Sequence, residues 1–191
     1  MKFRLSALTA LFLSAVTALP AAAKDTWPYD WLEWDRNADL WEIRLGAGAY
    51  DTRFFSGKDY APDGVVVNGE VVAPSPEALR IIGSPRPYIG VEGAFADDPI
   101  HVFYGGLTWQ AYFLDNVYYG FGLGGSVVSD TDVTSDRSLG SNVLFHLQFN
   151  AGIDITPQHS VQFFMNHFSN ANLADDNEGL DTTGGRFVYR F

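Results

Sequence analysis

The sequence predicts an all-β fold, an eight-stranded antiparallel transmembrane β-barrel of a bacterial outer membrane. Apolar and polar residues alternate with a period of two, and residues 142–155 keep this pattern for longer than a soluble strand usually does. Glycine (19 residues) and aromatics (15%) are abundant, whereas only 18% of residues are charged. No window downstream of the first 23 residues resembles a transmembrane helix, so any membrane crossing would be made by strands.

Residues 1–23 are predicted to be a signal peptide. Lys2 and Arg4 form a short basic start, and a largely apolar run extends from Leu5 to Leu19. Ala21 to Ala23 supply a small-x-small cleavage pattern, so the mature chain is expected to begin near Lys24. An uncleaved membrane anchor is the alternative, but the apolar run is short for spanning a bilayer. An aromatic-rich segment, 24–40, and the barrel, 41–191, would follow.

The charge and the missing cysteines exclude several classes of function. The chain has 12 basic and 23 acidic residues, a net charge of −11, and the predicted cleavage would remove two of the basic ones. So acidic a chain argues against a nucleic-acid partner. Without cysteine there is no disulfide or thiol chemistry. His101, His146 and His159 are scattered without metal-ligand spacing, so neither a metal nor a cofactor is expected.

The eight strands follow one another along the chain. They are expected at residues 41–49, 65–72, 88–95, 107–113, 117–127, 142–155, 160–169 and 186–191. Asn68-Gly69 would suit a hairpin turn, but a continuous strand is preferred because the two halves would be too short to span. An even number of strands closes a bacterial barrel with both ends on the periplasmic side. The terminal run of alternating aromatics, ending at Phe191, resembles the last strand of such proteins.

The polar faces of the strands are expected to fill the lumen, because an eight-stranded barrel is too narrow for a channel. This filling would consist of Glu42, Arg44, Glu70, Glu92, Gln110, His146, Gln148, Gln162, Asn166 and Arg190. A pore function is therefore disfavoured. The links 52–63, 129–139 and 170–182 are expected outside the cell, whereas the long link 74–86 has no explanation in the sequence. Trp27, Tyr29, Trp31 and Trp34 either anchor the chain at the periplasmic interface or belong to a tail.

A histidine and a serine mark the candidate site. His167 and Ser169 stand two residues apart in the seventh strand, so both side chains point to the same face. With Asp181 or Glu178 as the acid, they make up the inventory of a serine hydrolase. Polar side chains that face the hydrocarbon of the membrane call for a functional explanation, whereas polar side chains among the lipid headgroups do not. The seventh strand runs outward, and the pair shares the lipid-facing parity of Val161, Phe163 and Met165.

The stretch Asn166 to Leu173, together with Asn177 to Asp181, resembles the lipid A 3-O-deacylase family, the PagL-type outer-membrane esterases related to acyloxyacyl hydrolases. The family motif is His-x-Ser-Asn-Ala, then Asn-x-Gly, then an acid fourteen positions after the histidine. That acid is Asp181 here, where the best-known members have Glu, and Asn172 stands where Gly is often found.

This resemblance implies Ser169 as nucleophile, His167 as base and Asp181 as orienting acid. It also implies Asn170 as an oxyanion-hole contributor, through its side chain or its backbone N–H. The implied reaction is hydrolysis of the 3-O-hydroxyacyl ester of lipid A, or of lipopolysaccharide, in the outer leaflet, without a cofactor. Two alternatives stay open: a non-enzymatic structural or adhesion barrel, and an outer-membrane phospholipase. Arg53, Lys58 and Arg137 would lie in outer loops, either near phosphates of the substrate or, as we prefer, as ordinary surface charges.

Overall fold

The structure is a computed structural model that describes residues 33–34, 36–55 and 63–191. The predicted signal peptide, 1–23, lies outside the described residues, as do Trp27, Tyr29, Trp31 and Lys58. The division of the chain into signal peptide, aromatic-rich segment and barrel stays a prediction.

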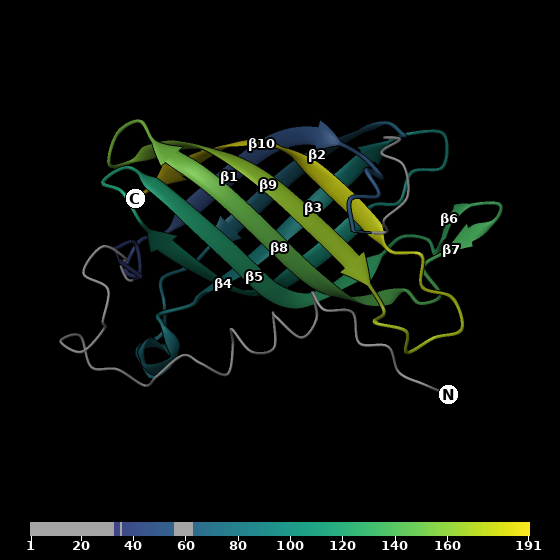
Figure 1. The fold of residues 1–191 in the computed structure, drawn as a ribbon, viewed down its shortest axis with the longest axis horizontal. Coiled ribbons are helices and arrows are strands. Elements are labelled where there is room, and N and C mark those ends of the chain that lie inside the picture. Colours follow the sequence, from purple (N-terminus) through teal and green to yellow (C-terminus); the bar gives the residue numbers. More distant parts are fainter. Residues whose placement is uncertain (1–32, 35, 56–62) are drawn as a thin grey trace.

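Eight strands close into one antiparallel barrel and confirm the predicted fold (Figure 1). Hydrogen-bonded neighbours follow the order β1-β10-β9-β8-β5-β4-β3-β2, and the strands run obliquely to the long axis. These strands are β1 (Glu42–Ala49), β2 (Val65–Val72), β3 (Arg86–Phe95), β4 (Val102–Tyr112), β5 (Val117–Val128), β8 (Val143–Asp154), β9 (His159–Ser169) and β10 (Leu180–Arg190). The short strands β6 (Asp132–Thr134) and β7 (Arg137–Ser138) pair in the link between β5 and β8.

Two strand starts were predicted wrongly. β4 begins at Val102, five residues earlier than expected, and β10 begins at Leu180 instead of Arg186. Both early portions contain glycine pairs, Gly105-Gly106 in β4 and Gly184-Gly185 in β10, which interrupt the alternation of apolar and polar side chains. The stretch 65–72 is one continuous strand, as predicted.

The links divide between the two ends of the barrel. The links β1–β2, β3–β4, β5–β8 and β9–β10 lie at one end, here called the outer end, opposite the end at which β10 finishes. The short turns after β4 and β8 lie at the other, periplasmic, end. Among the described residues, no helix is both long and apolar enough to cross a membrane.

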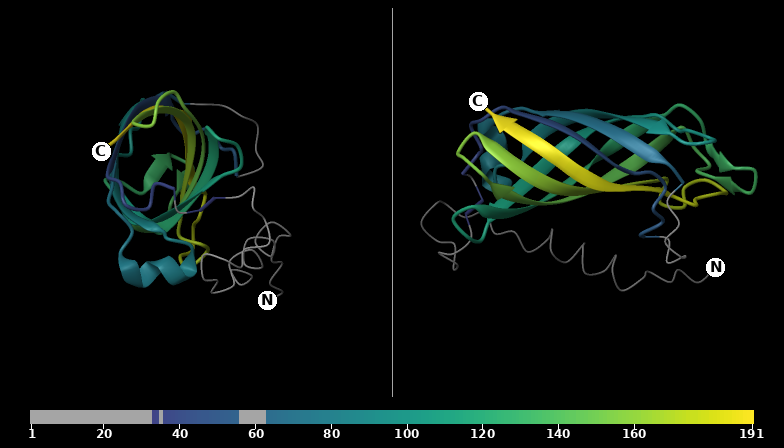
Figure 2. Two further views of the ribbon diagram at one scale, coloured as in Figure 1. Left: turned by 90° about the vertical axis from the view of Figure 1, so that its left-hand side faces the viewer. Right: turned by 90° about the horizontal axis from the view of Figure 1, so that it is seen from above.

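The long link before β3 contains the short 3-10 helix η1 (Glu77–Ile82), which lies outside the barrel wall (Figure 2). The carbonyl of Ile82 accepts a hydrogen bond from the indole N–H of Trp109, at 2.8 Å. Trp109 has lipid-facing parity and stacks on Phe121, with ring centroids 4.9 Å apart. It is nevertheless buried. The link therefore covers an aromatic patch near the periplasmic end, a role that the sequence pattern did not indicate.

The described part of the aromatic-rich segment reaches the periplasmic mouth of the barrel. Asn37 is buried there, and its side-chain amide donates to Tyr112 Oη at 2.8 Å. The Arg36 guanidinium lies over the ring of Tyr112, 3.9 Å from its centroid. Asn37 and Arg36 thus bring polar groups from outside the strands to Tyr112 of β4 at this mouth.

The lumen is filled by side chains, as predicted, and all ten residues of the expected polar filling are buried. Its centre is an ion-pair network in which Glu70 accepts from Arg44 at 2.7 Å and from Arg186 at 3.3 Å. Buried charges of this kind are tolerated because each is paired and hydrogen-bonded. Arg86 and Arg186 also belong to this lumen, although the prediction did not include them.

At the outer end the lumen changes from polar to apolar. Each of seven strands contributes one buried residue near its outer end, and these residues form what we call the apolar plug. The plug consists of Val66, Ala94, Val102, Val128, Leu144, Phe168 and Leu180. Leu139, from the link between β7 and β8, is part of the same hydrophobic cluster. The polar filling predicted from the sequence therefore does not extend to this end of the barrel.

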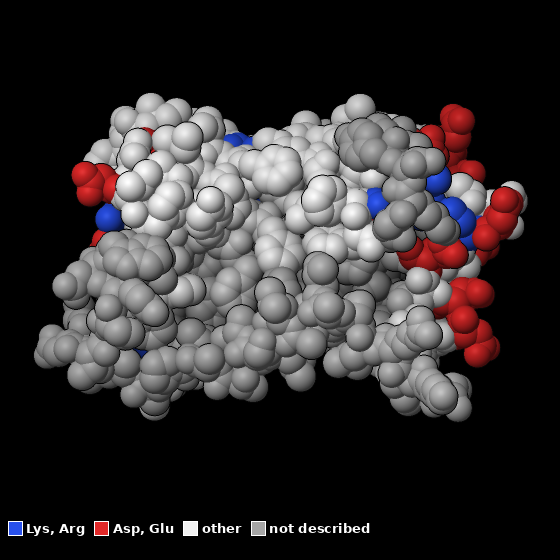
Figure 3. Space-filling view, viewed as in Figure 1, with Lys and Arg blue, Asp and Glu red and all other residues white. Residues whose placement is uncertain are grey.

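The outer wall is apolar, and the charges gather at the ends of the molecule (Figure 3). Most acidic side chains visible in that view lie at the outer end, around β6 and β7. Exposed apolar side chains from neighbouring strands cover the wall between the ends, as expected of a surface that faces lipid. They include Leu45, Val67, Ile89, Phe103, Tyr119, Phe145, Phe163 and Phe187.

Candidate active site

His167 and Asp181 are direct cross-strand neighbours on the outer face of the barrel. β9 and β10 pair so that these two residues stand opposite each other, and such neighbours on one face have adjacent side chains. The Nδ1 atom of His167 lies 2.5 Å from Oδ1 of Asp181. An aspartate, although one methylene shorter than glutamate, spans the gap because it lies directly opposite the histidine.

Ser169 is the last residue of β9, on the same face as His167 and opposite Phe145 of β8. It is partly exposed, and the chain leaves the barrel wall just beyond it. Ala171 and Asn172 then adopt left-handed conformations, with φ of 55° and 62°. Asparagine tolerates this region better than most residues do. Asn172 therefore suits this left-handed position.

Asn170 is buried and makes three hydrogen bonds within the outer loops. Its side-chain amide donates to the carbonyls of Leu139 at 2.7 Å and Asp176 at 2.5 Å. Its backbone N–H donates to Oδ1 of Asn177 at 3.0 Å. These bonds fix the loop that follows Ser169. In this structure they engage both the side-chain and the backbone donors, so the predicted oxyanion contribution of Asn170 stays a prediction.

Glu178, the alternative acid, contacts a different partner. Its Oε2 lies 3.7 Å from Nε of Arg137, and its backbone N–H donates to the carbonyl of Ser138. Arg137 in turn binds Asp51 through two hydrogen bonds, of 2.5 and 3.2 Å. Those bonds raise the pKa of the Arg137 guanidinium. The structure thus brings Asp181 to the histidine and Glu178 to the arginine.

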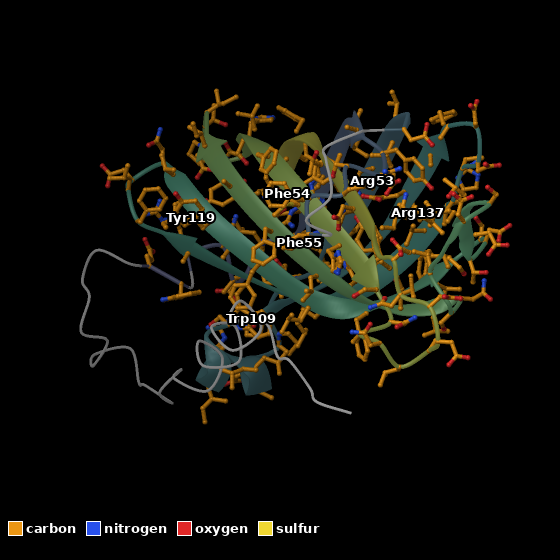
Figure 4. The ribbon with its side chains drawn as sticks, turned by 45° about the vertical axis from the view of Figure 1, so that its right-hand side comes forward. Arg53, Phe54, Phe55, Trp109, Tyr119 and Arg137 are labelled. Atoms are coloured by element: carbon orange, nitrogen blue, oxygen red, sulfur yellow. The ribbon has the colours of Figure 1, made fainter. Side chains whose placement is uncertain are left out.

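The segment from Asp51 to Phe55, here called the strap, contacts both Asp181 and His167. Figure 4 shows three of its residues, Arg53, Phe54 and Phe55, together with Arg137. The backbone N–H of Phe55 donates to Oδ2 of Asp181 at 2.7 Å, and the Phe55 ring lies 4.9 Å from the imidazole of His167, centroid to centroid. Sequence reasoning missed this contact. The only available signal was a pair of phenylalanines, Phe54-Phe55, in an otherwise polar link.

An apolar groove lies between β5, β8 and the loop that follows Ser169. Its volume is about 370 Å³. Phe145, the cross-strand neighbour of Ser169, is part of its wall, and Gly125 leaves room because it has no side chain. The groove is lined by Gly124, Gly125, Ser141, Val143, Leu144, Phe145, Asn170, Leu173 and Ala174. A hollow of this size and polarity suits a hydrocarbon chain.

Within residues 33–34, 36–55 and 63–191, no group of three or more His, Cys, Asp or Glu side chains could hold a metal ion. The outer face carries an imidazole, a carboxylate and a hydroxyl at His167, Asp181 and Ser169, which are groups that can serve in acid–base and nucleophilic chemistry.

The closed eight-stranded barrel with an apolar outer wall defines an outer-membrane β-barrel, and this one carries a histidine, an aspartate and a serine on its outward face. The chain belongs to the lipid A 3-O-deacylase (PagL) family, whose profile matches residues 86–190. This confirms the family that the motif around His167 and Ser169 suggested.

Individual relatives agree with this assignment. The chain is 30% identical over 94 residues to the lipid A deacylase PagL of Bordetella bronchiseptica, an alignment covering 45% of this chain and 52% of that protein. The match thus spans about half the length of this curated relative.

Two solved structures share the fold. The outer membrane enzyme PagL superposes with a TM-score of 0.56 at 16% identity, covering 78% of this chain and 98% of that one. Neisserial surface protein A (NspA) gives a TM-score of 0.50 at 14% identity, covering 80% and 96%. At these identities the likeness concerns the fold alone.

Proposed function

We propose that this protein is an outer-membrane serine esterase that removes the ester-linked 3-O-hydroxyacyl chain of lipid A, with Ser169, His167 and Asp181 as its catalytic triad. The supporting observation is the 2.5 Å contact between His167 and Asp181 on the lipid-facing wall. His167 stands two residues before Ser169 in the same strand. Placing polar groups on that wall costs stability, so their presence there points to a function. The family to which the chain belongs is described by this reaction.

In the proposed mechanism, Asp181 accepts a hydrogen bond from Nδ1–H of His167, so Nε2 of the imidazole is the free base. Nε2 removes the proton from Ser169 Oγ as this oxygen attacks the ester carbonyl of the 3-O chain. The imidazolium then returns the proton to the sugar oxygen, which leaves as a hydroxyl, and an acyl-enzyme remains. Water attacks this acyl-enzyme while His167 takes its proton, and His167 returns that proton to Ser169 Oγ as the bond to the acyl group breaks and the hydroxy fatty acid leaves. No cofactor is required.

The apolar groove beside Ser169 is the proposed site for the departing acyl chain. It begins at the cross-strand neighbour of Ser169 and is largely apolar, so a chain lying in it would bring its ester carbonyl to the nucleophile. Asn170 is proposed to support the oxyanion. Because its donors bind Leu139, Asp176 and Asn177 in this structure, it would stabilise the negative charge only after exchanging one of these partners.

The decisive experiment is expression in a bacterium with unmodified lipid A, followed by mass spectrometry of lipid A and phospholipids. We expect the wild type to remove one hydroxyacyl chain, and Ser169→Ala to remove none. Asp181→Asn should lose about 10⁴-fold in rate, as triads do when the orienting acid is replaced. Ser135→Ala, in the turn between β6 and β7, is the matched control and should behave as the wild type does.

Two results would contradict the proposal. An unchanged lipid A profile, with a folded barrel in the membrane, would favour a structural or adhesion protein. Shortened phospholipids with intact lipid A would favour a phospholipase.

A further inference from the structure

The carboxylate of Asp181 is held from two sides by different parts of the chain. Oδ1 faces His167 of β9, and Oδ2 accepts the backbone N–H of Phe55 from the first outer loop. Asp181 is only 3% exposed although its strand position faces outward. The strap therefore covers the acid on the side that would otherwise face lipid or water.

We propose that the strap is a positioning element of the catalytic site, and that the backbone N–H of Phe55 is the group that orients the Asp181 carboxylate. This inference rests on the proposed function. It assigns to a loop outside the motif a role in the same reaction. Phe55 is a positioning residue because it acts through Asp181 and not on the substrate.

The chemistry of the pair explains why a second donor is needed. The terminal torsion of an aspartate is broad, so a carboxylate with a single hydrogen bond can turn away from its histidine. A hydrogen bond to an ionised oxygen is shorter and stronger than one between neutral groups. With both oxygens engaged, the carboxylate plane is fixed and Oδ1 stays directed at Nδ1 of His167. The Phe55 ring also packs against the imidazole of His167.

The strap is built to hold this position. Asp51 and Arg53 both adopt left-handed backbone conformations, with φ of 49° and 55°, which persist only where surrounding contacts enforce them. Asp51 is bound by Arg137 of β7. The backbone N–H of Thr52 donates to the carbonyl of Asp181 at 2.8 Å, so the strap binds both the main chain and the side chain of the acid.

The start of the strap is anchored inside the barrel rim. Tyr50 is buried, and its hydroxyl accepts the backbone N–H of Ile100 at 3.0 Å. Burial raises the pKa of this hydroxyl to about 12, so it stays neutral beside Asp51. Through these contacts the first outer loop is held against β10, β7 and the link between β3 and β4.

The test removes the N–H without removing the side-chain carboxylate. Phe55→Pro deletes the donor, and Phe55→Leu keeps it while replacing the ring. We expect Phe55→Pro to lower kcat for lipid A by about ten- to a hundred-fold with little change in KM, because the groove is untouched. Phe55→Leu should retain most of the activity. Heat-modifiable electrophoretic mobility would check that each barrel is folded, and equal kcat values for the two variants would overturn the proposal.

A double-mutant cycle separates positioning from a general disturbance of the loop. In an Asp181→Ala background there is no carboxylate to orient, so adding Phe55→Pro should change the residual rate less than twofold. If the proline lowered the rate as much in that background as in the wild type, the strap would act by another route and the proposal would fail.

The rate at which a fluorophosphonate probe labels Ser169 reports the triad independently of the lipid substrate. We expect slow labelling in Phe55→Pro and fast labelling in Phe55→Leu and in the wild type. Equal labelling of all three would overturn the role of the strap, even if lipid A is deacylated. Fast labelling of the wild type with unaltered lipid A would overturn the proposed substrate but leave the role of the strap intact.

Discussion

The two ends of β9 and β10 differ in which face carries the polar residues. Toward the periplasmic end, Gln162 and Arg186 point into the lumen, whereas Phe163 and Phe187 cover the outer wall. At the outer end the arrangement is reversed: the lumen holds Phe168 and Leu180, and the wall carries the three residues of the candidate site, which are His167, Ser169 and Asp181.

This reversal shows how a membrane barrel can carry a polar site on its outside. The ion-pair network around Glu70 fills the lumen in the part of the barrel where the wall is apolar. The apolar plug fills the lumen at the outer end, where the wall carries polar residues. The stability of the strands at the site therefore comes from residues on the opposite face. The residues that brace the barrel and the residues of the candidate site thus lie on opposite faces of the strands, and substitutions on the two faces should have different effects.

The largest expected effect is on activity, from a change on the wall. His167→Leu would extend the apolar wall to the outer end, and deacylation should fall about 10⁴-fold because the base is lost. The free energy of unfolding should change by less than about 1 kcal/mol, since this face does not brace the barrel. Lipid A mass spectrometry and urea unfolding in vesicles measure the two quantities. Met165→Leu, two residues earlier on the same face, is the control, and an active His167→Leu variant would refute the assignment.

The next largest effect is expected on the free energy of unfolding, from a change in the ion-pair network around Glu70. Glu70→Ala leaves Arg44 and Arg186 without this shared partner, and it also removes the 2.6 Å hydrogen bond from Gln148. Breaking a buried ion pair from one side costs about 3–5 kcal/mol. Urea unfolding should show this loss, whereas Glu77→Ala on the exposed helix η1 should cost less than about 0.5 kcal/mol. A loss below about 1 kcal/mol for Glu70→Ala would mean that the network does not brace the lumen.

A somewhat smaller loss is expected in the apolar plug. Phe168→Ala should cost about 3 kcal/mol, the low end for a buried phenylalanine, because loops near the open end can relax into the space. Phe163→Ala, on the lipid-facing wall of the same strand, is the matched control and should cost clearly less. Comparable losses for the two variants would contradict the reversal of the faces.

The smallest effect is expected for the alternative acid. Glu178→Gln should change the deacylation rate by less than about twofold, since Glu178 is partly exposed and contacts Arg137, a type of surface pair that contributes little. The same rate assay that detects the loss in Asp181→Asn would detect any larger change. A loss comparable to that variant would transfer the orienting role from Asp181 to Glu178.

Much of this arrangement could be predicted from the sequence, because alternation reports which face a strand residue occupies. The face of His167 and Ser169 followed from the parity of Val161 and Phe163 alone. The acid was harder to assign, because its pairing with His167 depends on β10 starting at Leu180. Gly184 and Gly185 interrupt the alternation of side chains, so the sequence pattern does not show where this strand begins.

The remaining features depend on contacts between distant parts of the chain. The Phe55 N–H reaches Asp181 only because the first outer loop folds over the last hairpin, and no local pattern reports such a contact. The same holds for η1, which packs on Trp109 from the preceding link. Leu144 and Phe168 have lumen parity, but the expected polar filling left no reason to group them as a plug.

The candidate site lies on the outer wall of a barrel whose lumen is filled, so a lipid substrate would reach it from the surrounding membrane. The rate of the proposed reaction would then depend on the concentration of the substrate within the membrane. A substrate that reaches Ser169 along the plane of the leaflet arrives by lateral diffusion, so its mole fraction among neighbouring lipids takes the place of its amount per volume. Diluting lipid A with inert amphiphile at constant total lipid A should therefore slow the enzyme, whereas adding buffer should not.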